Sequence, residues 1–184
     1  MLNYICGIFI IIPLFILLMI LTKKGVKNPI WYLPILMFSI YLGCVLTITF
    51  FPLPISKEVI SLMREQNYLS NNFIPFKSIL HLLKGDFNII LKNIFGNILF
   101  FIPLGFFIPL LFEKFKNFKS VFLIGLLSSL SIEATQFLIS LFLGFTYRNT
   151  DIDDIILNVI GCVFGFIIYK TLIFISKGKF IMEI

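Results

Sequence analysis

The chain has 184 residues, of which 59% are hydrophobic and 13% charged, whereas soluble domains are about 45–50% apolar and about 25% charged. This composition excludes an ordinary soluble domain and indicates an integral membrane protein. The formal net charge of +6 would suggest a nucleic-acid partner in a soluble protein, but basic residues that flank membrane spans explain it here, so we expect no nucleic-acid binding.

Five apolar stretches are long enough to cross a membrane, because a spanning helix needs about 20 mostly apolar residues. They are residues 2–21, 30–51, 89–112, 120–145 and 155–176. Little of the chain is left for a separate soluble part, so we predict a single all-α transmembrane domain over residues 1–184. The first two spans show no polar stripe, and we assign them to contact with membrane lipids, to packing, or to self-association in a homo-oligomer.

The connection between the second and third spans, about residues 52–88, contains an amphipathic stretch. The run "IPFKSILHLLKG" places Pro75 at a first helical position and gathers Phe76, Ile79, Leu80 and Leu83 on one face. This stretch is too short to cross the bilayer. We therefore predict one interfacial helix, about residues 75–84, that lies in the headgroup layer.

Basic residues predict the orientation of the spans. Three regions that share one side of the membrane carry Lys23, Lys24, Lys27, Lys114, Lys116, Lys119, Lys177 and Lys179. The opposite side carries fewer, and most of these lie in the long connection. By the positive-inside rule, the sequence predicts an amino terminus outside the cell and a carboxyl terminus in the cytoplasm.

The fourth span carries polar residues at helical spacing. Ser129, Glu133, Gln136 and Ser140 are separated by four, three and four residues, which places them on one face of a helix. Glu133 lies near the middle of this span, where an acid costs several kcal/mol unless it is neutral, hydrogen-bonded or directed into a polar cavity. The stripe predicts either a functional cleft or hydrogen bonding between helices, worth about 0.6–2 kcal/mol per contact.

Polar side chains also occur in the two neighbouring spans. They are Asn93 and Asn97 in "NIFGNILFFIPLG", and Asp151, Asp154 and Asn158 in "YRNTDIDDIILNVIGCVFG". Three helices would then direct amide or carboxylate groups inward from one end. We predict a polar cleft with Arg148, Asp151 and either Asp153 or Asp154 at its opening, and with Glu133 at its inner end.

Several of these residues also have a structural explanation. Arg148 is suited to bidentate binding of phosphate or carboxylate, and it could instead pair with Asp151 or Asp154 to fix the loop. The two aspartates could serve as N-terminal residues that interact favourably with the helix dipole. Gly161 and Gly165 form a small-xxx-small pair, which predicts tight contact with another helix.

At these positions the sequence resembles the VanZ-like family of bacterial membrane proteins. The matching pieces are "NNFIPF" at 71–76, "NIFGNILFFIPLG" at 93–105, "IEATQ" at 132–136 and "RNTDIDDIILNVIGCVFG" at 148–165. The resemblance implies a small multi-pass protein of the bacterial cytoplasmic membrane, and the family's namesake gives low-level resistance to the glycopeptide teicoplanin. The family's motif positions would here be Asn93, Asn97, Pro103, Gly105, Glu133, Gln136, Arg148, Asp151, Asp154, Asn158 and Gly161.

Three functions remain open. The cleft could bind an amphiphile, such as a lipid-linked envelope precursor or a glycopeptide-type ligand, with Arg148 meeting its anionic groups. The protein could instead be an intramembrane enzyme that uses Glu133 as a general acid or base, with Asp151 and Asp154 holding a divalent cation against a phosphate of the substrate. It could also be a proton-coupled carrier in which Glu133 titrates. No residue pattern indicates a cofactor or a resident metal, and we expect neither.

Overall fold

The computed structural model describes residues 8–22, 28–66, 69–85, 87 and 91–175. Throughout these residues the regular structure is helical without a β-strand, and Asn72 and Asp151 form an isolated parallel bridge. Four helical segments are long and apolar enough to cross a membrane: Pro29–Phe50, Lys92–Leu111, Phe118–Leu143 and Ile152–Ile175. The chain is therefore an all-α, multi-pass membrane protein, and this prediction is confirmed.

The ends of these four segments lie within three residues of the predicted bounds. The first predicted span corresponds to α1 (Ile8–Thr22), an apolar helix shorter than the others. Residues 2–7 of that span lie outside the described part of the chain. The same holds for five basic residues of the orientation argument: Lys23, Lys24, Lys27, Lys177 and Lys179. The orientation stays a prediction.

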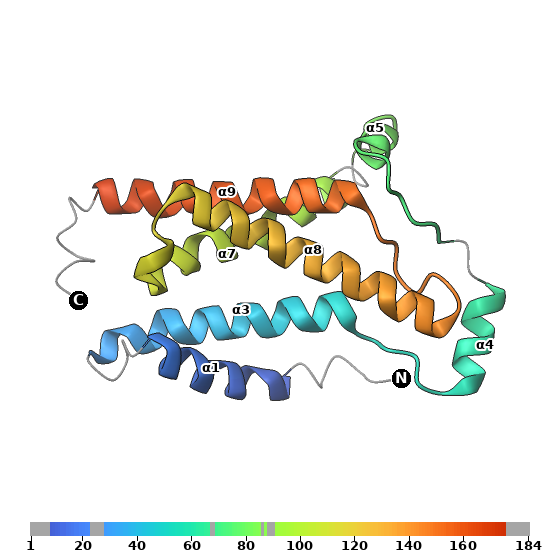
Figure 1. The fold of residues 1–184 in the computed structure, drawn as a ribbon, viewed down its shortest axis with the longest axis horizontal. Helices are drawn as coiled ribbons and strands as arrows, with labels where there is room; N and C mark the ends of the chain where they lie inside the picture. The colour runs from blue at the N-terminus through green and yellow to red at the C-terminus, as the bar shows by residue number, and fades with distance from the viewer. Residues whose placement is uncertain (1–7, 23–27, 67–68, 86, 88–90, 176–184) are drawn as a thin grey trace.

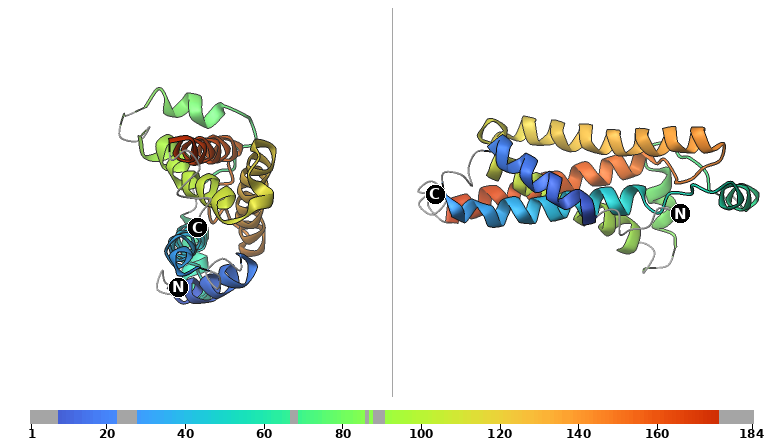
Figure 2. Two further views of the ribbon diagram at one scale, coloured as in Figure 1. Left: turned by 90° about the vertical axis from the view of Figure 1, so that its left-hand side faces the viewer. Right: turned by 90° about the horizontal axis from the view of Figure 1, so that it is seen from below.

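The long helices run along one common direction (Figure 1). The second span consists of η2 (Pro29–Trp31) and α3 (Tyr32–Phe50), and the third of η3 (Leu91–Phe95) and α7 (Gly96–Leu111). After η4 (Glu113–Phe115), the chain continues through α8 (Phe118–Leu143) and α9 (Ile152–Ile175). Helix α1 packs beside α3, while α7, α8 and α9 pack together (Figure 2).

Three glycines allow α7 and α9 to approach backbone to backbone. A Cβ atom on Gly161 of α9 would overlap the carbonyl oxygen of Ile98 in α7, and one on Gly105 of α7 would overlap the carbonyl oxygen of Cys162 in α9. Gly165 extends the same contact one turn further along α9. Such close approach requires residues without side chains, so the predicted tight contact of the small-residue pair is confirmed.

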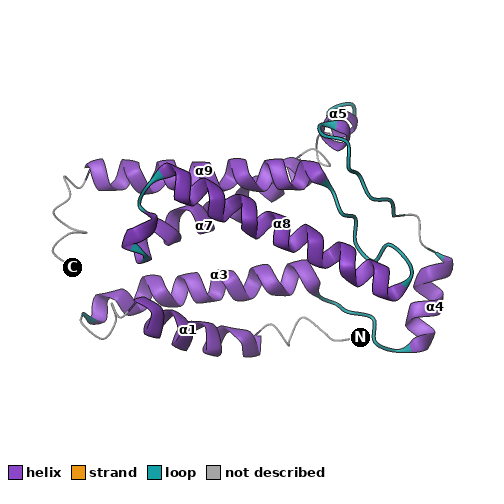
Figure 3. Cartoon of the chain, viewed as in Figure 1, coloured by secondary structure: helices purple, strands orange, loops and turns teal. Residues whose placement is uncertain are grey.

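The connection between α3 and α7 contains two short helices, where the sequence predicted one. They are α4 (Lys57–Glu65) and α5 (Lys77–Leu82), and both lie at the same end of the bundle as the loop between α8 and α9 (Figure 3). Pro75 does not begin a helix, because α5 starts only after Phe76, whose φ is 64°. Ser56 is the N-cap of α4, and its hydroxyl accepts from the backbone N–H of Val59 at 3.4 Å, a normal capping contact.

Candidate functional site

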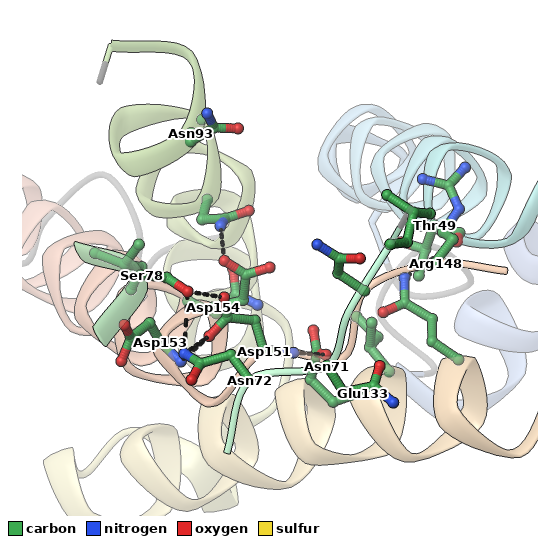
Figure 4. A pocket seen from close by; sticks show the side chains of 18 of the residues that line it. Thr49, Asn71, Asn72, Ser78, Asn93, Glu133, Arg148, Asp151, Asp153 and Asp154 are labelled. Atoms are coloured by element: carbon green, nitrogen blue, oxygen red, sulfur yellow. Dashed lines mark hydrogen bonds between the residues drawn. The ribbon is translucent and has the colours of Figure 1, made fainter. Parts of the chain in front are cut away.

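Helices α4 and α5 and the α8–α9 loop lie at one end of the bundle (Figure 1), and residues of these segments line a cavity of about 940 Å³. All eight residues predicted to form the cleft line it: Asn93, Asn97, Glu133, Gln136, Arg148, Asp151, Asp154 and Asn158. They come from η3, α7, α8, α9 and the α8–α9 loop (Figure 4). The structure therefore brings the whole predicted set to one place.

The polar stripe of α8 faces the interior of the bundle. Its members Ser129, Glu133, Gln136 and Ser140 are all buried, with exposed fractions between 0% and 8%. Ser129 Oγ accepts a hydrogen bond from Asn158 Nδ2 at 2.9 Å, and Gln136 Nε2 donates to the carbonyl of Thr49 at 3.3 Å. Part of the stripe thus joins α8 to α9 and α3, as the structural explanation expected.

Glu133 meets the N-terminus of α9. Its Oε2 accepts a hydrogen bond from the backbone N–H of Asp151 at 3.0 Å, where the positive end of the helix dipole favours an acidic group. This contact places Glu133 level with the start of α9, whereas the sequence suggested a position deeper than Asp151. The difference arises because the α8–α9 loop runs back along α8 before α9 begins (Figure 1).

The inner end of the cavity is formed by Asn158. This side chain is 4% exposed, and within the described residues its Oδ1 is buried and accepts no hydrogen bond. One turn nearer the start of α9, Asp154 Oδ1 accepts from Asn97 Nδ2. This bond joins α7 to α9 through two residues of the predicted set.

Asp151 holds the α4–α7 connection against α9. Its Oδ1 accepts from Asn72 Nδ2 and from the backbone N–H of Asp153, both at 2.9 Å, and its Oδ2 accepts from the hydroxyl of Ser78. The backbone N–H of Ile152 also donates to the Asn72 carbonyl at 3.0 Å. Asp151 therefore stabilises the first turn of α9, as one explanation predicted, and also fixes the neighbouring segment.

Asp153 has a role that the sequence did not reveal. Its side chain is 1% exposed, and its two oxygens accept from the backbone N–H groups of Phe76 and Ile79 at the start of α5. Phe76, which precedes α5, offers no side-chain cap of its own. Asp153 thus caps α5 from α9 and holds this helix beside the cavity.

Arg148 does not pair with Asp151 or Asp154. Its guanidinium donates to the carbonyl of Phe51 at 2.8 Å and lies 5.8 Å from the centre of the Tyr147 ring. Within the described residues no basic side chain lies within 4.0 Å of the cavity carboxylates. The prediction that Arg148 fixes the loop through an ion pair is therefore wrong. Arg148 contacts the end of α3 instead.

Two further residues fix the α8–α9 loop and were not predicted. Tyr147 places its hydroxyl 2.6 Å from the carbonyl oxygen of Pro52, and Asn71 Oδ1 accepts from the backbone N–H of Thr150 at 3.1 Å. Asn71 and Asn72 belong to the "NNFIPF" piece that carries the family resemblance, but the sequence did not predict which residues they contact.

The cavity carboxylates are not arranged as a metal-ligand set. Among the described residues, no group of three histidine, cysteine, aspartate or glutamate side chains could hold a metal ion. Both carboxylate oxygens of Asp151 already accept hydrogen bonds from the protein. The suggestion that Asp151 and Asp154 assist an enzymatic reaction therefore has no support from metal coordination, and that hypothesis depends on Glu133.

Comparison with known proteins identifies the family. No curated protein and no solved structure was found to match the chain. A family model described as VanZ/LLP1 matches residues 38–175, which contain every residue of the predicted cleft and all of α7, α8 and α9. Because this match covers most of the 184 residues, the chain belongs to the VanZ/LLP1 family.

Proposed function

We propose that the cavity binds the polar head of an amphiphilic ligand of the cell envelope, such as a lipid-linked precursor or a glycopeptide-type molecule. The observation that carries this proposal is the mixed lining of the cavity. Its polar residues are accompanied by the apolar side chains of Ile48, Phe100, Ile132 and Leu157. Pockets for organic ligands combine apolar walls with a few well-placed polar groups in this way.

The position of Ile48 suggests a path for the apolar part of the ligand. Ile48 lines the cavity and is also 56% exposed. Because α3 is long and apolar enough to cross the membrane, its exposed apolar surface is suited to face lipid. A ligand could therefore keep its head in the cavity while its chains extend into the bilayer.

Orientation forms part of the proposal. In the bacterial cytoplasmic membrane, with the amino terminus outside and the carboxyl terminus inside, the cavity would open toward the outer surface. Arg148 lines the cavity and is only partly buried. Its guanidinium is suited to bind an anionic group of the ligand.

Gly96 offers a direct test. It lines the cavity, and a Cβ atom on it would meet nothing within 4 Å, so Gly96→Trp should fill the cavity while Gly96→Ala leaves it open. In native mass spectrometry of the gently solubilised protein, we expect the wild type and Gly96→Ala to retain a specific envelope amphiphile and Gly96→Trp to lose it. Identical, unselective lipid profiles in the wild type and both variants would contradict the proposal and would indicate that the polar residues serve only in hydrogen bonds between helices.

We propose from the family resemblance that this binding contributes to resistance to teicoplanin. The same two variants test this proposal. In a susceptible host, expression of the wild type or Gly96→Ala should raise the inhibitory concentration, and expression of Gly96→Trp should not. An unchanged concentration with the wild type would argue against a resistance function without affecting ligand binding.

One observation favours a second candidate, an intramembrane enzyme that modifies the bound amphiphile. Glu133 Oε2 is held by the backbone N–H of Asp151, which leaves Oε1 without a protein donor among the described residues, in a side chain that lines the cavity. A product formed from the retained lipid by the wild type but not by Glu133→Gln would support this candidate. Unchanged lipid would leave binding as the function.

A further inference from the structure

Three amide side chains of the cavity already use an N–H group within the protein. Asn97 Nδ2 donates to Asp154, and Asn158 Nδ2 donates to Ser129. Gln136 Nε2 donates to a backbone carbonyl of α3. An amide side chain that has committed its N–H group in this way presents its oxygen to other groups. The amides therefore add acceptors to the cavity.

Three acceptors around the inner part of the cavity lack a donor among the described residues. Glu133 Oε2 accepts from the backbone N–H of Asp151, and Asp154 Oδ1 accepts from Asn97 Nδ2. The second oxygens of these carboxylates, Glu133 Oε1 and Asp154 Oδ2, are the first two of the three acceptors. The third is Asn158 Oδ1, on a side chain that is only 4% exposed. A buried acceptor left unpaired is costly, so this oxygen is an independent indication of a missing donor.

Acidic and basic side chains both line the cavity, but its lysine and arginine side chains, Lys77, Lys92 and Arg148, lie more than 4.0 Å from its carboxylates. Glu133, Asp151, Asp153 and Asp154 all line it, and in the described part of the chain none has a basic side chain within 4.0 Å. Arg148 donates to the Phe51 carbonyl. Carboxylates removed from water and without a counter-charge favour a cation nearby. A ligand that is both a cation and a hydrogen-bond donor would satisfy both requirements.

We propose that the ligand of this cavity carries a primary ammonium group that donates to Glu133 and Asp154, with Asn158 Oδ1 as a further acceptor. The inference rests on the proposed function and names the chemical class of its ligand. A primary ammonium supplies a compact charge with three N–H donors. A quaternary ammonium supplies the charge without donors, and the absence of a metal-ligand set among the described residues disfavours a metal ion in the same place.

Three matched phospholipids separate these requirements. Phosphatidylethanolamine carries a primary ammonium, phosphatidylcholine carries the same charge without an N–H donor, and phosphatidylglycerol carries no cation. Each is added, with identical acyl chains, to the full-length protein in detergent, and bound lipid is measured by native mass spectrometry. We expect phosphatidylethanolamine to bind at least about tenfold better than the other two, as charge-assisted hydrogen bonds of ordinary strength would produce.

Two variants connect this preference to the cavity. Glu133→Gln and Asp154→Asn each remove a charge while keeping one acceptor oxygen, and each should bring the ratio of phosphatidylethanolamine to phosphatidylcholine binding close to unity. Glu113→Gln is the matched control, because Glu113 lies in η4 at the other end of the bundle, in an ion pair with Lys116 at 3.7 Å. Its preference should equal that of the wild type, and thermal unfolding of each variant establishes that it is folded.

The outcomes distinguish this inference from the proposed function. Equal binding of phosphatidylethanolamine and phosphatidylcholine, abolished in Gly96→Trp, would overturn the ammonium inference and leave the binding function intact. A preference that persists in both Glu133→Gln and Asp154→Asn would also overturn it, because the ammonium would then bind elsewhere. Unselective binding that Gly96→Trp does not change would overturn both.

Discussion

Replacing Gly161 by alanine should destabilise the folded protein by about 1–3 kcal/mol or more, the cost of overpacking a well-packed contact. The new Cβ would overlap the backbone carbonyl of Ile98 in α7. A backbone atom cannot rotate away as the end of a side chain can, so α7 and α9 would have to separate. Separation would also displace Asn97 from Asp154, whose hydrogen bond joins these helices at the cavity.

Thermal unfolding of the detergent-solubilised protein measures this effect, and Gly96→Ala is its control. In α7 a Cβ on Gly96 meets nothing within 4 Å, so this variant should be as stable as the wild type or slightly more stable, since alanine favours a helix by about 1 kcal/mol over glycine. The same intrinsic gain applies at Gly161, so a lower unfolding temperature of Gly161→Ala would have to come from the overlap with α7. Equal unfolding temperatures for the two variants would contradict the close α7–α9 contact.

Replacing Asp153 by alanine should release α5 from the bundle. The carboxylate is 1% exposed and accepts from the backbone N–H groups of Phe76 and Ile79. Each of these partly buried donors left unpaired would cost up to about 1–3 kcal/mol, which the chain can avoid by moving α5 into solvent. We expect hydrogen exchange of residues 76–82 to accelerate, and retention of the proposed ligand to fall because α5 contributes to the lining of the cavity.

Asp153→Asn provides a graded comparison. Asparagine keeps one acceptor oxygen and places an N–H group where the other was, so the exchange of α5 should lie between those of the wild type and Asp153→Ala. Helix α4, which has no contact with Asp153 among its hydrogen bonds, should keep its protection in both variants. Unchanged exchange of residues 76–82 in Asp153→Ala would show that α5 is held by other contacts.

The features that the sequence predicted well are those fixed by composition and local spacing. The long spans follow from runs of apolar residues, and the burial of Ser129, Glu133, Gln136 and Ser140 follows from their helical spacing. The close contact at Gly161 and Gly165 was predictable for the same reason, because small residues at this spacing create a flat helix face. Each depends on residues only a few positions apart.

The contacts that the sequence did not predict join distant segments. Asp153 and Phe76 are 77 residues apart, and Asn72 and Asp151 are 79 residues apart. No local pattern marks Asp153 as the cap of a helix in another segment. The position of Glu133 beside Asp151 likewise depends on the path of the α8–α9 loop, which spacing along α8 cannot determine.

Helix α4 is different, because its signals were present in the sequence. Ser56 is a favoured N-cap residue, and Val59, Ile60 and Met63 follow at helical spacing. The apolar pattern predicts an interfacial helix only over residues 75–84, where the apolar run is longer. The N-cap residue together with this spacing is sufficient to predict α4 as well.

Photo-crosslinking tests the binding of an amphiphile in the cavity most directly. A photoreactive benzoylphenylalanine replaces either Phe100, which lines the cavity, or the adjacent Leu99, which is 62% exposed and outside the lining. After irradiation of cells, mass spectrometry should find one class of envelope amphiphile attached at position 100 and only bulk membrane lipid at position 99. The same bulk lipids at both positions would contradict the existence of a selective ligand site.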